Sequence, residues 1–341
     1  MTLQTVWCFL WGLLWAVYLM TDGFDLGIGM LLPFLGRDET RRRTMVHAMG
    51  PLWNGNEVWL LTAGGVTFAA FPAVYAAMFS ALYAPLMLIL FALIVRGIAV
   101  EFRGKVDSPG WRALWDRVLL VGSLLPILLL GVAFANLFRG LLLDRSGYHG
   151  TLISLLNPYG LAGGVLFVLM ATLHGALWLA AKTSGDLQRE AAACAGKTWV
   201  ALLIVAVIFL AATWFDTPLY RNYLAQPVLF LVPLLAVAAL LATRVFLAQG
   251  KFWPAWGASA VTIVAVTFFG VIGLFPNMLM SRTDPSASLT AFNASSSPLT
   301  LTIMLTVVAI FVPLVLIYQG WAYRLFAGQV TEEEAAAGEG Y

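Results

Sequence analysis

Nine long apolar runs dominate this sequence and leave little room for any fold other than a membrane-spanning one. About 20 consecutive apolar residues are needed to cross the hydrocarbon core of a bilayer as a helix. Hydrophobic residues make up 61% of the chain and charged residues 11%, whereas a soluble domain has about 25% charged residues. We therefore predict an all-α polytopic membrane protein that forms a single integral membrane domain over residues 1–341. The predicted spans are residues 6–35, 52–71, 73–102, 111–138, 158–181, 198–215, 228–248, 253–280 and 299–326.

The distribution of basic residues predicts the orientation of these spans. Cytoplasmic loops of membrane proteins carry an excess of lysine and arginine. The segments around the ends of odd-numbered spans hold most of the 19 basic residues, namely Arg37, Arg41, Arg42, Arg43, Arg103, Lys105, Arg112, Arg117, Lys182, Arg189, Lys197, Arg244, Lys251 and Arg324. Those around the ends of even-numbered spans hold Arg139, Arg145, Arg221 and Arg282. We expect the N-terminus outside and the C-terminus in the cytoplasm.

Two of the apolar runs contain acids and amides where a membrane helix is usually apolar. Asp22 and Asp25 interrupt the first run, and Asn54 and Glu57 lie near the start of the second. A carboxylate at the bilayer centre costs about 3 kcal/mol on insertion scales, and such residues usually serve transport, proton relay or ligand binding. Each pair has the i,i+3 spacing that places two side chains on one helix face. These segments are therefore the candidate functional site.

The third run adds a cation to this set of acids. It contains Arg96 and, near its end, Glu101. The predicted orientation places both residues, and the four polar residues of the first two runs, in the cytoplasmic half of the membrane. Arg96 and Glu101 are five positions apart and point in different directions, so we expect Arg96 to pair with an acid on another helix. Together the six residues could hold and pass protons; alternatively, Arg96 neutralises one acid and the others cap or brace helices. Asp22 is the residue most readily explained as structural.

Other site chemistry is not indicated. His174 is the only histidine inside a predicted span, and haem iron needs an axial ligand, commonly His, Met or Cys. A single intramembrane histidine without a second one in another span is more typical of a hydrogen-bonded packing residue. No cluster of carboxylates and histidines predicts a metal site, and no motif predicts a nucleophile or a nucleotide site. The net charge of +2 does not indicate nucleic acid binding. We predict no catalytic residue and no cofactor bound directly by this chain.

Several motifs resemble subunit II of the bacterial cytochrome bd-type quinol oxidases. The two acidic segments read DGFDLGIG over residues 22–29 and WNGNEVWL over residues 53–60. The resemblance covers the whole chain. The remaining motifs lie at residues 62–65, 71–72, 96–103, 131–136, 157–161, 275–276, 288–291 and 296–301.

The resemblance implies a fold, a complex and an activity. The implied fold has two four-helix bundles and one peripheral helix. The implied partner is subunit I, which carries two haems b, one haem d and the quinol site; a small accessory subunit occurs in some complexes. Such a complex, in the bacterial cytoplasmic (inner) membrane, oxidises quinol, reduces O2 to water and takes the chemical protons from the cytoplasm. Subunit II is implied to bind no haem and to provide a proton route, in some members also an O2 route and a structural quinone.

The resemblance also assigns roles to single residues. Asp25 corresponds to the second acid of the DGFD motif, and Arg96 with Glu101 to the charged end of the third span. Trp59 corresponds to the tryptophan of the second span and is a candidate for O2 access or gating.

One position departs from the family pattern. Better-known members carry aspartate in the segment WDGN, where this chain has Asn54. An asparagine does not titrate, and the nearest carboxylate is one turn later, at Glu57. A proton route through this point must therefore use Glu57, water or a different path.

Two other classes of function fit the same pattern. A proton-coupled secondary transporter also carries acids within its spans, although such transporters usually have inverted repeats and paired broken helices, which we do not find. A purely structural scaffold subunit would carry the same acids in neutralised form.

Overall fold

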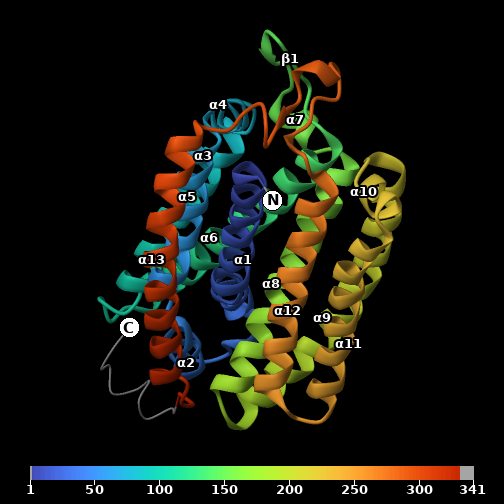
Figure 1. Cartoon of the computed structure of the whole chain (residues 1–341). Helices are drawn as coiled ribbons and strands as arrows, with labels where there is room; N and C mark the ends of the chain where they lie inside the picture. The colour runs from blue at the N-terminus through green and yellow to red at the C-terminus, as the bar shows by residue number, and fades with distance from the viewer. Residues whose placement is uncertain (1, 331–341) are drawn as a thin grey trace.

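The structure, a computed structural model, describes residues 2–330 and is almost entirely helical (Figure 1). Within these residues, eight helices are long and apolar enough to cross a membrane. This confirms an all-α polytopic membrane protein. The eight helices are α1 (Leu3–Leu35), α5 (Tyr83–Phe102), α6 (Pro109–Arg139), α8 (Pro158–Lys182), α9 (Gly185–Asp216), α11 (Leu231–Ala248, preceded by the 3-10 turn η1, Pro227–Phe230), α12 (Phe252–Leu274) and α13 (Pro298–Leu325).

The predicted second and third spans form three helices. Helix α3 (Trp53–Ala70) covers the second span, but the polar residues in its first two turns lower its mean hydropathy, so it is not among the eight. Pro72 occupies the first turn of α4 (Pro72–Ala81), where a missing N–H costs nothing. The chain continues through Leu82 into α5, so that the third span is helical with one interruption.

Helix α1 lies at the centre and packs on α3, α6, α8 and α12 (Figure 1). Two glycine contacts allow the closest approaches. A Cβ atom at Gly27 would lie 2.1 Å from the carbonyl oxygen of Ala171 on α8. A Cβ atom at Gly131 would lie 2.4 Å from the carbonyl oxygen of Gly163, also on α8. Small residues at such crossings let membrane helices pack backbone against backbone.

Helix α13 is the most exposed of the long helices, with only Leu301 buried along its length. It is attached mainly near its two ends. The Trp7 Nε1–H group donates to the Leu301 carbonyl oxygen at 3.0 Å. After its other end, Lys182 donates to the carbonyl oxygens of Phe326 and Gly328.

The two ends of the helix bundle differ in construction (Figure 1). One end, which we call the N-terminal face, carries the start of α1 with α4, α7 (Leu152–Leu155), α10 (Tyr220–Ala225), the 3-10 turn η2 (Pro285–Ala287) and two antiparallel hairpins. The hairpins pair β1 (Leu143–Asp144) with β2 (Gly147–Tyr148) and β3 (Asn277–Leu279) with β4 (Leu289–Thr290). The opposite end, the α2 face, carries α2 (Glu39–Met49).

The predicted span over residues 253–280 is shorter in the structure. Helix α12 ends at Leu274, and the chain turns into β3. Pro276 explains this end, because proline has no N–H group for the helix and disfavours helical geometry at the residue before it.

Candidate functional site

A buried ion pair joins α1 and α5 in the half of the molecule nearer the α2 face. The side chains of Arg96 and Asp22 are both fully buried. Arg96 Nη2 donates to Asp22 Oδ1 at 2.8 Å and Nη1 to Asp22 Oδ2 at 3.3 Å. Glu57 on α3 joins the pair, with its Oε2 3.4 Å from Arg96 Nη1. The expectation that Arg96 pairs with acids on other helices is therefore confirmed.

Helix α6 packs closely against α5 at the position of Arg96. A Cβ atom at Gly122 would lie 2.9 Å from both Arg96 Cβ and the Ala92 carbonyl oxygen. Glycine at this position lets the backbone of α6 pack directly against α5 where the Arg96 side chain begins. Arg96 Nε has no hydrogen-bond partner among residues 2–330.

Asp25 belongs to a second polar group, which connects α1, α3 and α13. Its side chain is buried, and its Oδ2 accepts from Asn56 Nδ2 at 2.7 Å. Asn56 Oδ1 accepts in turn from the Tyr323 hydroxyl at 2.7 Å and from Gln319 Nε2 at 3.2 Å. Gln319 Oε1 accepts from Trp59 Nε1 at 2.9 Å. Asp25 Oδ1 has no partner within the described part of the chain.

The structure brings four of the six predicted polar residues together and leaves two apart. Asp22, Asp25, Glu57 and Arg96 form what we call the membrane cluster, together with Asn56. Asn54 is exposed in the first turn of α3, and Glu101 is exposed near the end of α5. Neither side chain has a hydrogen bond or ion pair within residues 2–330. Trp59 is buried and reaches the cluster through Gln319.

Sequence reasoning missed Asn56, Gln319 and Tyr323. A signal for Asn56 was present, because it belongs to a stripe of small or polar residues at helical spacing. This stripe, Asn56, Ala63, Thr67 and Ala70, forms the buried face of α3 together with Trp53 and Trp59. Asn54 lies outside the stripe, so the i,i+3 pairing of Asn54 with Glu57 singled out the wrong amide. Gln319 is the only amide in the last predicted span, which marks it as unusual but not as a partner of Asn56.

A second set of charges lies at the α2 face, outside the membrane cluster. The Arg103 guanidinium donates to Glu39 Oε1 and Oε2 at 3.0 and 2.9 Å and to Asp116 Oδ1 at 2.5 Å. Arg42 Nη1 donates to Asp116 Oδ2 at 3.0 Å. Burial alone would raise the pKa of Glu39, but hydrogen bonds from Arg103 and Arg43 outweigh it and lower that pKa below its ordinary value. We call these residues the α2-face network.

His174 lies in a closed hydrogen-bond environment between α1, α8 and α12. Its Nδ1 is 2.6 Å from Ser259 Oγ, and its Nε2 is 3.0 Å from the Met20 carbonyl oxygen. The imidazole also stacks on Trp256, with ring centroids 5.1 Å apart. Both ring nitrogens are thus engaged, and this geometry does not fit an axial haem ligand. In the part of the chain that the structure describes, no group of three or more His, Cys, Asp or Glu residues could hold a metal ion.

Known proteins resemble the chain over nearly its whole length. Cytochrome bd-I ubiquinol oxidase subunit 2 of Escherichia coli K12 is 36% identical, and the alignment covers 97% of this chain and 96% of that protein. Cytochrome bd ubiquinol oxidase subunit 2 of Bacillus subtilis 168 is 35% identical, with 98% of each chain covered. Among solved structures, a chain of the bd oxidase of Geobacillus thermodenitrificans has the same fold, with a TM-score of 0.79, 15% identity, and 96% of this chain and 99% of that chain covered.

A family comparison agrees with these relatives. The model of the family described as cytochrome bd terminal oxidase subunit II matches residues 3–326. That match spans all the long helices and every residue of the membrane cluster. The chain therefore belongs to the cytochrome bd terminal oxidase subunit II family.

Proposed function

We propose that this chain is the haem-free subunit of a quinol:O2 oxidoreductase of the aerobic respiratory chain. It assembles in the bacterial inner membrane with a haem-bearing subunit I, where quinol is oxidised and O2 is reduced to water, and has no catalytic activity alone. The relatives from Escherichia coli and Bacillus subtilis, whose names are those of ubiquinol oxidase subunits, support this assignment. The haems, two of type b and one of type d, belong to subunit I. The engaged nitrogens of His174 are consistent with this division.

The proposed topology has nine crossings. The ninth is α3, because it packs along the central helix α1 and ends next to the start of α4. One four-helix bundle then consists of α1, α3, α4 with α5, and α6; the other consists of α8, α9, α11 and α12. Helix α13 is peripheral. The N-terminal face lies outside and the α2 face in the cytoplasm, which places the α2-face network and most basic residues on the cytoplasmic side.

This topology is tested by labelling with a membrane-impermeant maleimide. Cys8 and Cys194 are replaced by Ala, and single cysteines are placed at two exposed sites, Lys105→Cys near the α2 face and Arg145→Cys in the β1–β2 hairpin. In sealed spheroplasts we expect label only at position 145, and in inverted vesicles only at position 105. The reverse result would overturn the orientation, and label at both positions from one side would overturn the number of crossings.

The membrane cluster is proposed as part of a cytoplasmic proton route. One observation carries this proposal: three carboxylates, Asp22, Asp25 and Glu57, surround a single buried guanidinium, Arg96. A medium of low dielectric disfavours unbalanced charge, so protons neutralise the excess of carboxylates. A cluster with more acids than cations can therefore exchange protons without leaving a bare charge.

The geometry suggests a role for each residue of the route. Asp22 is fully engaged by Arg96 and is the fixed counter-ion. Glu57 is 23% exposed at its side chain and is the proton acceptor nearest the α2 face. Asp25 is buried, keeps one oxygen without a partner, and holds the transferred proton. Glu101 and Asn54, both exposed, line the approach from the cytoplasm, where Asn54 can order water but does not titrate.

The subunit is also proposed to offer an apolar space for a structural quinone or for O2. A cavity of about 130 Å³ lies between α1, α6, α8, α9, α11 and α12, and carbon atoms form nearly all of its lining. It suits an isoprenoid chain or a gas. Trp59 is proposed to gate O2 access, because its ring is buried while its N–H group is tied to Gln319 on the peripheral helix.

The proton route is tested with Glu57→Gln in the assembled complex. Glutamine keeps the size and the hydrogen bond to Arg96 but does not titrate, so quinol-driven O2 consumption and charge translocation in proteoliposomes should fall, while assembly and haem spectra stay normal. Asn54→Asp should be tolerated, since it restores an acid one turn away. Asp107→Asn, a change of a fully exposed acid in the loop between α5 and α6, is the matched control. Normal turnover and charge translocation in Glu57→Gln would leave Glu57 with a scaffold role and place the inlet elsewhere.

A further inference from the structure

A polar hollow at the N-terminal face lies far from the membrane cluster. It has a volume of about 770 Å³ and lies between the ends of α6 and α9, α10 and the segment after α12. Its charged lining residues are Arg139, Arg221 and Asp216, and Ser281, Ser288 and Asn277 add polar groups. No step of the proposed proton route uses this hollow.

The charges in this hollow lack partners in the protein. Arg139 ends α6 and Arg221 lies in α10, and within residues 2–330 neither side chain makes an ion pair or hydrogen bond. The Arg139 Nε atom is buried, also without a partner. Asp216, the last residue of α9, is exposed and likewise unpaired in the described chain. A buried N–H donor without an acceptor is costly, so an external acceptor would stabilise this arrangement.

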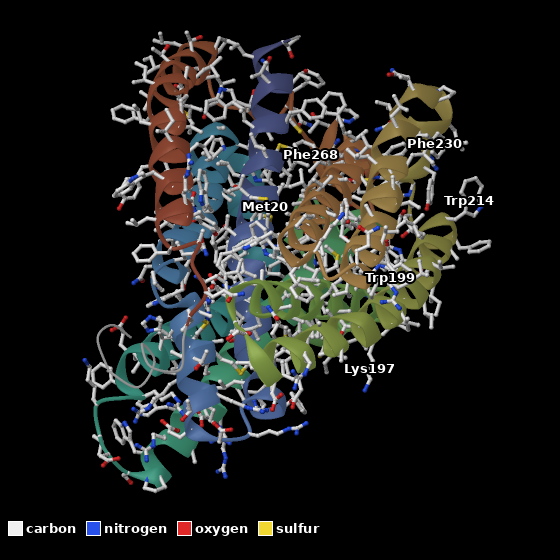
Figure 2. All side chains as sticks on the ribbon, turned by 90° about the horizontal axis from the view of Figure 1, so that it is seen from below. Met20, Lys197, Trp199, Trp214, Phe230 and Phe268 are labelled. Atoms are coloured by element: carbon white, nitrogen blue, oxygen red, sulfur yellow. The ribbon has the colours of Figure 1, made fainter. Side chains whose placement is uncertain are left out.

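The surroundings of the hollow are those of a membrane interface. Phe215 and Trp214, both in its lining, are 85% and 54% exposed, and Trp214 projects from the edge of the molecule (Figure 2). Aromatic side chains of this kind collect at the level of lipid headgroups. The apolar cavity described above approaches from the membrane side, since Phe138, next to Arg139, and Leu210, one turn before Trp214, belong to its lining. The polar hollow therefore lies next to the apolar cavity.

We propose that this hollow binds the headgroup of an aminophospholipid from the surrounding leaflet. The phosphodiester lies between Arg139 and Arg221, because the guanidinium fork matches two phosphate oxygens. The ammonium group of the lipid lies at Asp216, which a purely anionic headgroup would leave unpaired. The exposed aromatic rim formed by Trp214 and Phe215 favours a lipid over a free phosphate ion, which has no apolar part to bury.

The test is native mass spectrometry of the complex purified with subunit I in mild detergent. The wild-type complex should retain phosphatidylethanolamine, and Arg139→Gln and Arg221→Gln should each lower its retention about fivefold, as expected for one basic group at a membrane surface. Asp216→Asn should shift retention from phosphatidylethanolamine towards phosphatidylglycerol. Arg145→Gln is the matched control, because Arg145 lies at the same face, outside the hollow, and bonds Ser286; its lipid profile should equal that of the wild type.

A second measurement separates loss of the site from loss of folding. Added phosphatidylethanolamine should raise the melting temperature of the delipidated wild-type complex and leave that of Arg139→Gln unchanged. Equal lipid retention in wild type and both arginine variants would overturn the proposal. Displacement of the bound species by inorganic phosphate would also overturn it in favour of an ion site, and loss of quinone instead of phospholipid in Arg139→Gln would reassign the hollow to a quinone headgroup.

Discussion

The membrane cluster and the α2-face network use the same residue types in opposite proportions. In the α2-face network, the two carboxylates Glu39 and Asp116 each receive hydrogen bonds from two arginines. In the membrane cluster, Arg96 donates hydrogen bonds to two carboxylates, Asp22 and Glu57, and a third carboxylate, Asp25, lies beside them. The α2-face network has more cations than acids and is partly exposed, whereas the membrane cluster has more acids than cations and is buried except at Glu57.

This difference separates a structural role from the proton-handling role that we propose for the membrane cluster. At the α2 face hydrogen bonds from Arg103 and Arg43 lower the pKa of Glu39, and the contacts bind α2 to α5 and α6. On its other side α2 is tied to α9 through the Arg41–Glu190 ion pair at 3.2 Å. Such a network holds α2, α5, α6 and α9 together. The membrane cluster has a surplus of carboxylates, and Asp25 keeps one oxygen without a partner in the described residues, which is where the proposed route would hold a proton.

The largest effect is expected from removing the cation of the membrane cluster. Arg96→Leu would leave Asp22 and Glu57 buried without a counter-charge, and breaking a buried ion pair in this way costs about 3–5 kcal/mol. We expect little assembled complex on purification and a lowered melting temperature. The double variant Arg96→Leu with Asp22→Leu should recover much of the assembly, because an apolar pair can replace a buried ion pair at little cost. Equal assembly of the single variant and the wild type would contradict the assignment of Arg96 as the anchor of the cluster.

The next effect separates the two aspartates of α1. Asp25→Asn removes the proposed proton holder while keeping a hydrogen-bonding group towards Asn56, so the complex should assemble. Its quinol-driven O2 consumption should fall about tenfold, equivalent to about 1.4 kcal/mol in the activation barrier. Asp22→Asn should instead lower assembly, because it removes the direct counter-charge of Arg96. Two variants with the same defect, either in turnover or in assembly, would remove the distinction between these roles.

The sequence predicted the participants of the membrane cluster better than their pairing. Charged residues within apolar runs are conspicuous, so Asp22, Asp25, Glu57 and Arg96 could be identified without a structure. Their partners depend on how α1, α3 and α5 are rotated, and the i,i+3 rule does not determine that rotation. Asn56, rather than Asn54, faces Asp25 for this reason.

The contacts that α13 makes with α3 could not be predicted from the sequence. Gln319 and Tyr323 lie more than 250 positions from Asn56 along the chain, yet both bond to it. The membrane-spanning helices could be predicted, because a long apolar run indicates a segment that can span a membrane. The interruption at Leu82 and the early end of α12 depend on local turns that periodicity does not reveal.

The smallest effect is a pH-dependent one in the α2-face network. The pKa of Glu39 is lowered in the folded protein, so the stabilisation from this carboxylate is fully present above its ordinary pKa of 4.5 and is lost as the pH falls through the lower folded value. The Glu39 side chain is 34% exposed, and solvent screening holds the contribution to below about 1 kcal/mol. We therefore expect Glu39→Gln to have a slightly lower melting temperature than the wild type at pH 7, with the difference shrinking as the pH falls below 4.5.

Glu101→Gln, a change of an exposed and unpaired acid near the same face, should match the melting temperature of the wild type at every pH. A difference between Glu39→Gln and the wild type that stays constant down to acidic pH would mean that Glu39 contributes through packing, and the α2-face network would then lose its electrostatic contrast with the membrane cluster.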